Sequence, residues 1–435
     1  MNVKDIRSAH FVGIGGINMS AVAKLLLAAG VRVSGSDAVE SEQTKILAER
    51  GATVTIGQRA ENIPMECDVV IYTSAAPETN PEREEARRRN IPEMTNFAFL
   101  GEWFKDDAVI LVVGTHGKST TTAMLGSIFE KADMDPTVIV GSKLPSFPDG
   151  NLRIGHTRLV VIEGDEYAKH FLEFHPQAII LNNIELDHTD VFPNIEEMIA
   201  TFRELVGRLP EGGVLVANMN DANVRKIVGD VSGPRVIPFT DAQPFSLQIP
   251  GEFNRRNATA AALMAKESGV SDAVIHEALF AFPGIWRRFE YLRIQNGARI
   301  YSDYGHHPTA IAATLAAAKE SFPSSRVLLC FQPHHRNRTK NLFLDFVTSF
   351  DLADVLVLCE IYDVKGRDAK QDESVSSKDL VDAIVRHDAD REVKRVVEYA
   401  SDPKSAVDQV LVHAKEGDVV IVMGAGDIDD AIRNV

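Results

Sequence analysis

The sequence has few cysteines and no long apolar run. Its three cysteines, Cys67, Cys330 and Cys359, lie far apart and form neither a CxxC pair nor a zinc-binding spacing. This pattern favours a reduced, cytoplasmic protein over a disulfide-bonded secreted one. No run approaches the roughly 18 apolar residues of a membrane span. The N-terminal residues also lack the features of a signal peptide, so we expect no membrane association.

Positive charge is also scarce. The 435 residues include 62 Asp and Glu against 46 Lys and Arg, which gives a formal net charge of -16. A general nucleic-acid binder usually needs a basic face, so this balance argues against nucleic acid as a partner. A locally positive pocket for an anionic small molecule remains compatible with the composition.

Short apolar runs alternate with helical patterns along the whole chain, which predicts an α/β protein with about three parallel sheets. Helical periodicity occurs at 20–29, 120–131, 195–209 and 309–321. The strand-like runs lie at 10–16, 68–74, 108–117, 158–166, 177–183, 212–218, 326–332, 353–360 and 418–426. Breaks near 102–107 and 289–291 predict three domains, 1–106, 107–289 and 290–435.

The first glycine-rich segment, GIGGINMS at 13–20, leads from a predicted strand into a predicted helix. Glycines allow a diphosphate to approach the backbone, and a helix N-terminus favours an anion. Asp37 follows the next strand, where it can meet a ribose or a base. The third glycine of a dinucleotide fingerprint is replaced by Asn18, so a nicotinamide cofactor and a merely structural turn both remain alternatives.

The second glycine-rich segment follows a predicted strand and is typical of a phosphate-binding loop. Backbone N–H groups in such a loop face phosphate oxygens, Lys118 supplies a charge, and the Ser119 hydroxyl can bind Mg²⁺. Val112 stands where the Walker pattern has its first glycine. The predicted ATP-binding residues here are Gly114, Thr115, His116, Gly117, Lys118, Ser119 and Thr120.

Acidic residues follow two further strands. Glu163 and Glu166 follow the run at 158–162, and Asp187 and His188 follow the run at 177–183. Mg²⁺ needs few protein ligands because it keeps waters and phosphates, so one carboxylate for each ion is enough. We expect Glu163 to hold one metal ion and His188 a second, although each residue taken alone is compatible with an exposed strand end.

Two asparagines, Asn254 and Asn257, open an alanine-rich helix. An amide side chain both donates and accepts, so it can pair with an adenine edge. Capping of the helix by Asn254 is the alternative.

The last third of the chain has two histidine-rich loops after predicted strands, DYGHHP at 303–308 and QPHHRNR at 332–338, preceded by Arg287 and Arg288. They suggest an anion or carboxylate site. A zinc site and simple solvated loops are the alternatives; no cysteine joins the histidines in either loop.

Taken in order, these segments resemble those of one family, the ATP-dependent Mur ligases of peptidoglycan synthesis. The resemblance covers essentially the whole chain. It is carried by GIGGINMS, GTHGKSTT, EGDEYAKHF, the segment at 183–188, FNRRNA, DYGHHP, FQPHHRNRT and a tail, MGAGDI, at 423–428. Four departures from the usual motifs are Gln58, Phe253, Ser302 and His335.

The resemblance implies a Rossmann-like domain for a UDP-sugar, a central P-loop-type domain for ATP and Mg²⁺, and a Rossmann-like domain that brings the amino acid. It assigns Gly15, Gly16, Ser20, Asp37, Ser74, Glu166, Tyr304, His306, His334 and Arg338 to substrate binding. To ATP it adds Asn254, Asn257, Arg287, Arg288 and Asp303. Its expected catalytic residues are Lys118, Glu163, His188 and His306, and its expected metal ligands are Ser119, Glu163 and His188.

The branch of the family most similar to the chain joins L-alanine to the carboxylate of UDP-N-acetylmuramate. The resemblance therefore implies a cytoplasmic ligase, monomer or homodimer, that forms an acyl phosphate and releases ADP and phosphate. Branches that add D-Glu or a dibasic residue use a carbamylated lysine, and residues 189–209 contain no lysine. The branch that recycles murein tripeptide also lacks it and is the alternative; it ranks second because it lacks the FQPHxxxRT motif.

Overall fold

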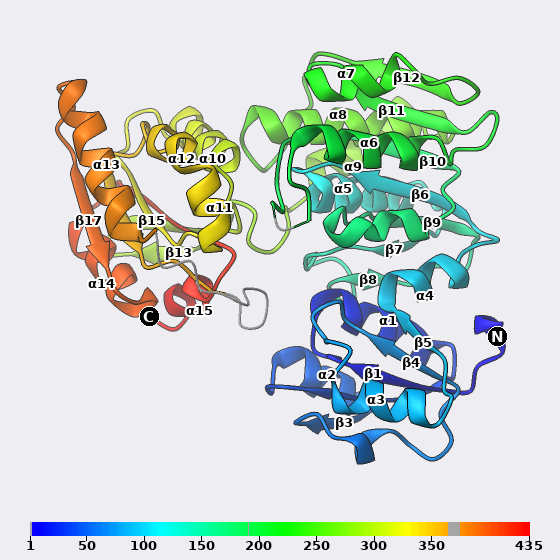
Figure 1. The fold of residues 1–435 in the computed structure, drawn as a ribbon. Coiled ribbons are helices and arrows are strands. Elements are labelled where there is room, and N and C mark those ends of the chain that lie inside the picture. The colour runs from blue at the N-terminus through cyan, green and yellow to red at the C-terminus, as the bar shows by residue number, and fades with distance from the viewer. Residues whose placement is uncertain (1, 190, 364–374) are drawn as a thin grey trace. The chain divides into compact units, whose positions relative to one another are not determined.

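The computed structural model describes residues 2–189, 191–363 and 375–435. The chain forms two compact units. One comprises Met1–Ile184, Met198–Thr240 and Ala260–Ala278, and the other comprises Glu185–Glu197, Asp241–Thr259 and Leu279–Val435. Three mainly parallel sheets follow one another along the chain, which confirms the predicted α/β class (Figure 1).

The first sheet has five parallel strands in the order β3-β2-β1-β4-β5. Its strands are β1 (Ser8–Val12), β2 (Arg32–Asp37), β3 (Thr53–Ile56), β4 (Val69–Tyr72) and β5 (Glu93–Thr95). The accompanying helices are η1 (Val3–Asp5), α1 (Ile17–Ala28), α2 (Glu42–Glu49), η2 (Ala60–Asn62), α3 (Pro81–Arg88) and α4 (Asn96–Trp103). Every residue of the central strand β1 is buried, as expected in a parallel sheet.

The second sheet has the order β12-β11-β10-β6-β9-β7-β8, and only β7 and β8 pair in antiparallel fashion. Its strands are β6 (Ala108–Val113), β7 (Thr137–Ile139), β8 (Leu152–Arg153), β9 (Leu159–Glu163), β10 (Ala178–Leu181), β11 (Val214–Asn218) and β12 (Arg235–Phe239). The helices in this part of the chain are α5 (Lys118–Lys131), η3 (Tyr167–Glu173), α6 (Ile195–Val206), α7 (Ala222–Val228), α8 (Glu252–Glu267) and α9 (Asp272–Ala281).

The third sheet has the order β13-β14-β18-β15-β16-β17, with β13 antiparallel to β14. Its strands are β13 (Glu290–Gln295), β14 (Ala298–Asp303), β15 (Val327–Phe331), β16 (Val355–Cys359), β17 (Val396–Ala400) and β18 (Val419–Met423). Its helices are α10 (Pro308–Ser321), α11 (Arg336–Asn341), α12 (Phe343–Ser349), α13 (Ser377–Asp390), α14 (Pro403–His413) and α15 (Ile428–Arg433). Alternate residues of β15 enter two different hydrophobic clusters, one for each face of the sheet.

Local sequence signals explain where several helices begin. Asn80 caps α3 and is followed by Pro81, and Asp402 caps α14 in the same way with Pro403. Such side chains accept hydrogen bonds from N–H groups that the helix itself leaves unpaired. By contrast, α1 and α5 begin after Gly16 and Gly117 with no side-chain cap, an arrangement that suits a helix N-terminus facing a phosphate.

Each apolar run that predicted a strand overlaps one, although β1 begins before its run at 10–16, and each predicted helix is present. Helices α1 and α5 begin slightly earlier than the predicted residues 20 and 120, and α6 ends before residue 209. The two antiparallel pairs, β7 with β8 and β13 with β14, were not predicted. The predicted domain boundaries remain predictions.

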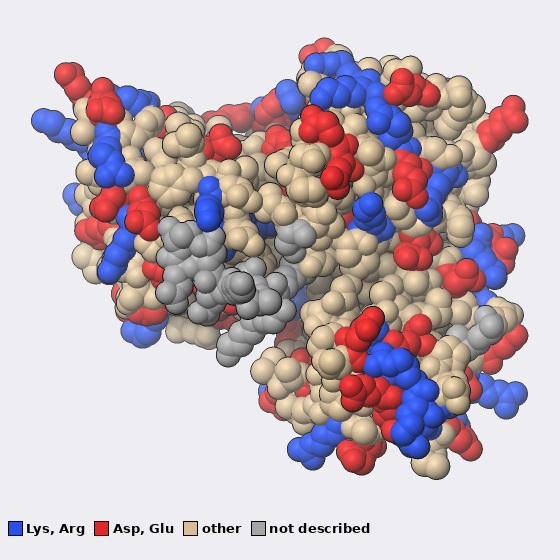
Figure 2. Space-filling model, viewed as in Figure 1, with Lys and Arg blue, Asp and Glu red and all other residues tan. Residues whose placement is uncertain are grey.

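Two surface properties bear on the class of protein. On the face shown in Figure 2, Lys and Arg side chains are interspersed with Asp and Glu side chains. Among the helices in the described part of the chain, none is long and apolar enough to cross a membrane.

Candidate functional site

The predicted phosphate-binding segments leave their sheets where the strand order changes direction. In the first sheet β1 lies between β2 and β4, and the first glycine-rich segment follows β1. In the second sheet β6 lies between β10 and β9, and the second glycine-rich segment follows β6. Open parallel sheets bind ligands at the carboxyl ends of strands at such a switch point. The topology therefore supports both segments as ligand loops.

The first glycine loop lies tightly against the end of β2. Gly13 has a φ of 85°, a conformation that favours glycine, and its N–H group donates to the Ser36 carbonyl at 2.8 Å. The Gly15 N–H group donates to a carboxylate oxygen of Asp37 at 2.8 Å. Asp37, predicted to contact the UDP group, therefore also fixes the shape of the loop.

Ser74, another predicted UDP contact, follows β4 and touches a histidine that the sequence analysis did not assign. The Ser74 Oγ atom lies 2.7 Å from Nε2 of His170, and Nδ1 of His170 lies 3.4 Å from the Asp165 carboxylate. The His170 ring stacks on Phe97 at a centroid separation of 4.5 Å. His170 therefore fixes the position of the Ser74 hydroxyl. The only sequence signal was its place in the EGDEYAKHF motif.

The second glycine loop is held in place by hydrogen bonds to Asn183, a residue to which the sequence analysis gave no role. The Asn183 side chain accepts from the His116 N–H group at 2.7 Å and donates to the His116 carbonyl at 3.0 Å. A Cβ atom on Gly114 would lie 2.9 Å from the Asn183 carbonyl oxygen, so the loop and the end of β10 are in close contact. Gly117 has a φ of 81° at the start of α5. The available signal for Asn183 was its place at the start of the segment at 183–188.

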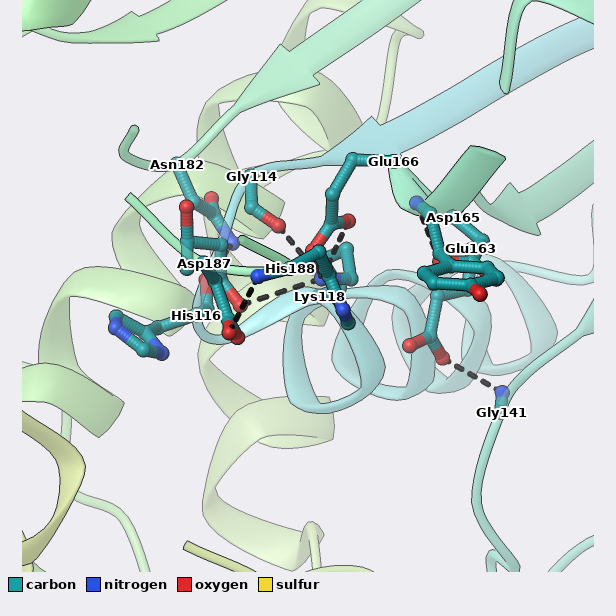
Figure 3. Close-up of polar contacts among 12 residues, drawn as sticks. Gly114, His116, Lys118, Gly141, Glu163, Asp165, Glu166, Asn182, Asp187 and His188 are labelled. Carbon is teal, nitrogen blue, oxygen red and sulfur yellow. Dashed lines mark hydrogen bonds and ion pairs between the residues drawn. The ribbon is translucent and has the colours of Figure 1, made fainter. Parts of the chain in front are cut away.

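Lys118 lies at the centre of this loop and is held by three acceptors (Figure 3). Its Nζ atom donates to the carbonyls of Gly114 at 2.7 Å and Thr115 at 3.2 Å, and lies 2.8 Å from the Glu166 carboxylate. Burial opposes its charge, but Glu166 and Glu163 outweigh burial and raise the pKa of Lys118 above its usual value. The lysine is therefore a permanent cation in the predicted phosphate site. Glu166, predicted to bind substrate, contacts Lys118.

Oxygen donors for a metal ion lie beside the same loop. The Ser119 hydroxyl donates to Oε1 of Glu163 at 2.8 Å. The Gly141 N–H group donates to Oε2 of Glu163 at 2.6 Å (Figure 3). A hydroxyl and a carboxylate are the hard oxygen ligands that Mg²⁺ prefers. The donor set thus fits the predicted ion. His188, predicted to hold a second ion, takes a left-handed backbone with φ of 52°, and its N–H group donates to Asp187 at 2.7 Å.

The two asparagines predicted to bind adenine lie inside α8. Asn254 is 3% exposed and donates from Nδ2 to the Pro250 carbonyl at 2.6 Å. Helix α8 begins at Glu252, so Asn254 is not its cap, and the capping alternative is wrong. Asn257 lies one turn further along the same helix and is also buried.

Arg287 and Asp303, predicted to lie near phosphate and ribose, organise the loops around β14 and β18. The Arg287 guanidinium donates to the carbonyls of Gly424 and Gly426. The guanidinium groups of Arg287 and Arg288 each lie 5.0 Å from the centroid of the Tyr304 ring. The Asp303 carboxylate accepts from the N–H groups of Phe289 at 2.7 Å and Gly305 at 2.6 Å. Burial raises the pKa of Asp303, although the positive charge of Arg288 opposes the shift.

The histidine-rich loops meet around a buried ion pair. Arg338 donates from Nε and Nη2 to one oxygen of Asp187, at 2.8 and 2.7 Å. The rings of His306 and His334 lie 5.8 Å apart, and Nε2 of His306 is 4.0 Å from Asp187. Burial opposes ionisation of Asp187, but Arg338 and the neighbouring histidines hold its pKa well below the usual value. The structure thus brings the predicted residues Tyr304, His306, His334 and Arg338 together.

The protonation of His306 follows from its surroundings. Its Nδ1 atom lies 3.1 Å from the Tyr304 carbonyl oxygen, which can only accept, so Nδ1 carries the proton. Burial and the positive charge of Arg338 hold the pKa of His306 well below its usual value, although Asp187 opposes them. The neutral ring therefore has an acceptor lone pair on Nε2.

Comparison with known proteins identifies relatives of this chain. Models of the Mur ligase family match three segments: the catalytic domain at residues 8–107, the middle domain at 112–241 and the glutamate ligase domain at 287–426. The UDP-N-acetylmuramate–L-alanine ligase of Alkaliphilus metalliredigens is 35% identical over 98% of this chain and 96% of its own length. The chain belongs to the Mur ligase family.

Further proteins that are similar to this chain are also ligases of this family. The UDP-N-acetylmuramate–L-alanine ligase of Clostridium kluyveri is 38% identical over 97% of this chain and 96% of that protein. Among solved structures, the UDP-N-acetylmuramate–alanine ligase of Thermotoga maritima is 28% identical, with a TM-score of 0.81, over 98% of this chain and 97% of that one. A murein peptide ligase from Psychrobacter arcticus shares the fold at 23% identity and a TM-score of 0.71. The resemblance predicted from the motifs is confirmed.

Proposed function

We propose that this Mur ligase joins L-alanine to the carboxylate of UDP-N-acetylmuramate, with ATP as the energy source, in the synthesis of peptidoglycan precursors. The use of ATP is supported by the loop that contains Lys118 at the switch point of the second sheet, with Ser119 and Glu163 beside it. The choice of substrate is supported by the relatives of 35% and 38% identity that bear this activity in their names.

The first step is transfer of the γ-phosphoryl group of ATP to the sugar carboxylate, which gives an acyl phosphate. The protein's part in such a transfer is positioning and stabilisation of charge. Lys118 faces the phosphates, and in this role its ammonium exchanges the Gly114 and Thr115 carbonyls for phosphate oxygens. Gly117 leaves the start of α5 open to the same oxygens.

A magnesium ion would be held by Ser119 and Glu163, and we expect His188 to be a ligand of a second ion. When bound, Mg²⁺ neutralises charge on the terminal phosphates of ATP. Glu163 is already oriented for this role because the Gly141 N–H group and the Ser119 hydroxyl fix its two oxygens.

The second step is attack of the alanine amine on the acyl phosphate, which releases phosphate and forms the amide. The amine must be neutral to attack. The neutral His306 ring presents an acceptor on Nε2, so we assign it to accepting a hydrogen bond from the alanine amine and orienting it. Arg338 and His334, which lie within 3.3 Å of each other, would orient a carboxylate in this region.

Phosphate release is the decisive measurement. Purified protein is incubated with ATP and Mg²⁺, and phosphate is followed after adding UDP-N-acetylmuramate, then L-alanine, then murein tripeptide in place of alanine. We expect release only with UDP-N-acetylmuramate and L-alanine together. Release only with the tripeptide would assign the chain to the recycling branch, and release from ATP alone would indicate a plain ATPase.

Two variants connect this activity to the site. Lys118→Ala should lower turnover by a factor of about 100 to 1000, the usual effect of removing one group that stabilises transition-state charge. Lys105→Ala is the matched control because Lys105 is an exposed lysine that pairs with Glu102. Unchanged turnover in Lys118→Ala would remove the phosphate loop from the proposed mechanism.

A further inference from the structure

A second buried lysine lies away from the ATP loop. Lys24 is on α1 and is only 2% exposed. Its Nζ atom donates to the Gln43 side chain at 3.0 Å, to the Asp149 carbonyl at 3.0 Å and to Oδ1 of Asn151 at 2.9 Å. Burial lowers the pKa of Lys24 to about 8, although Asp149 opposes this shift. The lysine is therefore mostly charged at neutral pH, and its three N–H donors match three acceptors.

Two of these acceptors belong to residues 140–151, which we call the bridging loop. This loop runs between β7 and β8 of the second sheet, whereas Lys24 lies on α1, a helix that accompanies the first sheet. The Val140 N–H group donates to the Asn151 carbonyl at 3.1 Å and closes the loop at its base. Arg50 pairs with Asp149 and Lys143 pairs with Glu42, so the loop also contacts α2.

Lys24 fixes which way the Asn151 amide points. An ammonium can only donate, so the oxygen of the Asn151 side chain faces Lys24 and its nitrogen faces the opposite side. That nitrogen donates to the Ile17 carbonyl at 2.5 Å and to the Ser20 hydroxyl at 3.2 Å. Both partners lie in the first turn of α1, directly after the glycine loop.

The other end of the bridging loop touches the proposed metal carboxylate. The Gly141 N–H group donates to Glu163 at 2.6 Å. A Cβ atom on Gly141 would lie 3.0 Å from the same carboxylate, so the backbone approaches Glu163 closely. One short loop thus contacts Glu163 at its start and the first turn of α1 at its end.

We infer that Lys24 and Asn151 are positioning residues that couple the ATP site to the UDP-sugar site through the bridging loop. The inference rests on the proposed function, which places ATP phosphates near Glu163 and the UDP group at the glycine loop. A ligand that restricts the motion of Glu163 and Gly141 also restricts the motion of the bridging loop where it begins. Asn151 then holds the first turn of α1, and with it the glycine loop, in one position.

The test measures how binding at one site changes affinity at the other. Coupling between two ligands is reciprocal, so it appears as a factor by which a non-hydrolysable ATP analogue with Mg²⁺ changes the Kd of UDP-N-acetylmuramate. The Kd is measured by calorimetry on the full chain with and without the analogue. We expect the analogue to tighten binding in the wild type by about fivefold or more, within the usual range of coupling factors.

Lys24→Met should reduce this factor to near one, and Asn151→Ser should do the same because the shorter side chain cannot span Lys24 and Ile17. Lys24→Gln retains a donor for Asn151 and should restore part of the coupling. If Lys24→Met does not fold, the other two variants still decide the question. The matched control is Lys45→Met, which removes an exposed lysine that pairs with Glu40 on the surface.

The outcomes separate the inference from the proposed function. No binding of UDP-N-acetylmuramate by the wild type would count against the proposed function itself. A wild type that binds both ligands without coupling would overturn the inference. The inference would also be overturned if Lys24→Met and Asn151→Ser fold and bind UDP-N-acetylmuramate more weakly but keep the coupling factor of the wild type. That pattern would show that the two residues have a structural role alone.

Discussion

The Lys118 ammonium lies 2.8 Å from the Glu166 carboxylate, and both side chains are largely removed from solvent. The lysine expected to face ATP is therefore paired with a negative charge of its own domain. This pair explains how a cation can be kept in a buried phosphate site.

The pair should contribute to stability. Its charges raise the pKa of Lys118, so its contribution is present at neutral pH and is lost only as pH rises through that raised value. Glu166→Gln leaves the lysine charge without its closest partner, and the free energy of unfolding should fall by about 3 kcal/mol at neutral pH, the usual cost of breaking a buried pair. Urea unfolding measures the change.

The control for this experiment is Glu85→Gln. Glu85 pairs with the exposed Arg88 within one helix, and screening by solvent makes such pairs weak. Its unfolding midpoint should move much less than that of Glu166→Gln. Equal shifts in the two variants would contradict a stabilising role for the Lys118 pair.

Some features of this site could be predicted from the sequence and others could not. The loops were predictable because a strand, a glycine-rich turn and a helix are contiguous in the chain. The contact between Ser119 and Glu163 was not, because it depends on which strands are neighbours. Glu163 ends β9, and the register of the sheet sets it beside Val112 at the end of β6.

One missed element did have a local signal. Strands β13 and β14 form an antiparallel hairpin across Asn296 and Gly297, which have φ values of 52° and 79°. Positive φ at both positions is the requirement of a type I′ turn, and an Asn-Gly pair between apolar residues is its usual sequence. The prediction of parallel strands throughout overlooked this pair.

The buried pair of Arg338 and Asp187 predicts a pH-dependent loss of stability. The pKa of Asp187 is held well below its usual value, so the pair stabilises the fold at neutral pH, and this contribution disappears as the carboxylate is protonated in acid. Arg338→Met leaves a buried carboxylate without its main partner. The free energy of unfolding should fall by about 3 to 5 kcal/mol at neutral pH, and by much less in acid.

Urea unfolding of the wild type and of Arg338→Met, at neutral pH and at a pH well below the usual pKa of an aspartate, measures this difference. Arg391→Met is the control, since Arg391 is a half-exposed arginine that pairs with Asp351. A difference between Arg338→Met and the wild type that stays the same at both pH values would show that lost packing, rather than the charge of Asp187, accounts for the effect.

The cysteines should differ in reactivity. Burial raises the pKa of Cys359 to about 12 and that of Cys330 well above its usual value, so both are neutral thiols at neutral pH. Cys67 is partly exposed, although burial also raises its pKa. Because the thiolate is the reactive form, a maleimide should label Cys67 first, with the other two labelled only after denaturation. Mass spectrometry of the labelled peptides checks the order, and early labelling of Cys330 would contradict it.

The contact between Ser74 and His170 predicts that the two residues act as one unit. Ser74→Ala should raise the KM for UDP-N-acetylmuramate about tenfold, the effect of losing about 1.4 kcal/mol, and leave the KM for ATP unchanged. His170→Phe retains the stacking on Phe97 but loses the nitrogen beside the Ser74 hydroxyl, so it should raise the same KM. Because His170 acts through Ser74, the double variant should be no worse than Ser74→Ala alone.

His156→Phe, at a histidine with 93% side-chain exposure, is the control. Additive effects of the two substitutions would mean that His170 contacts the substrate independently.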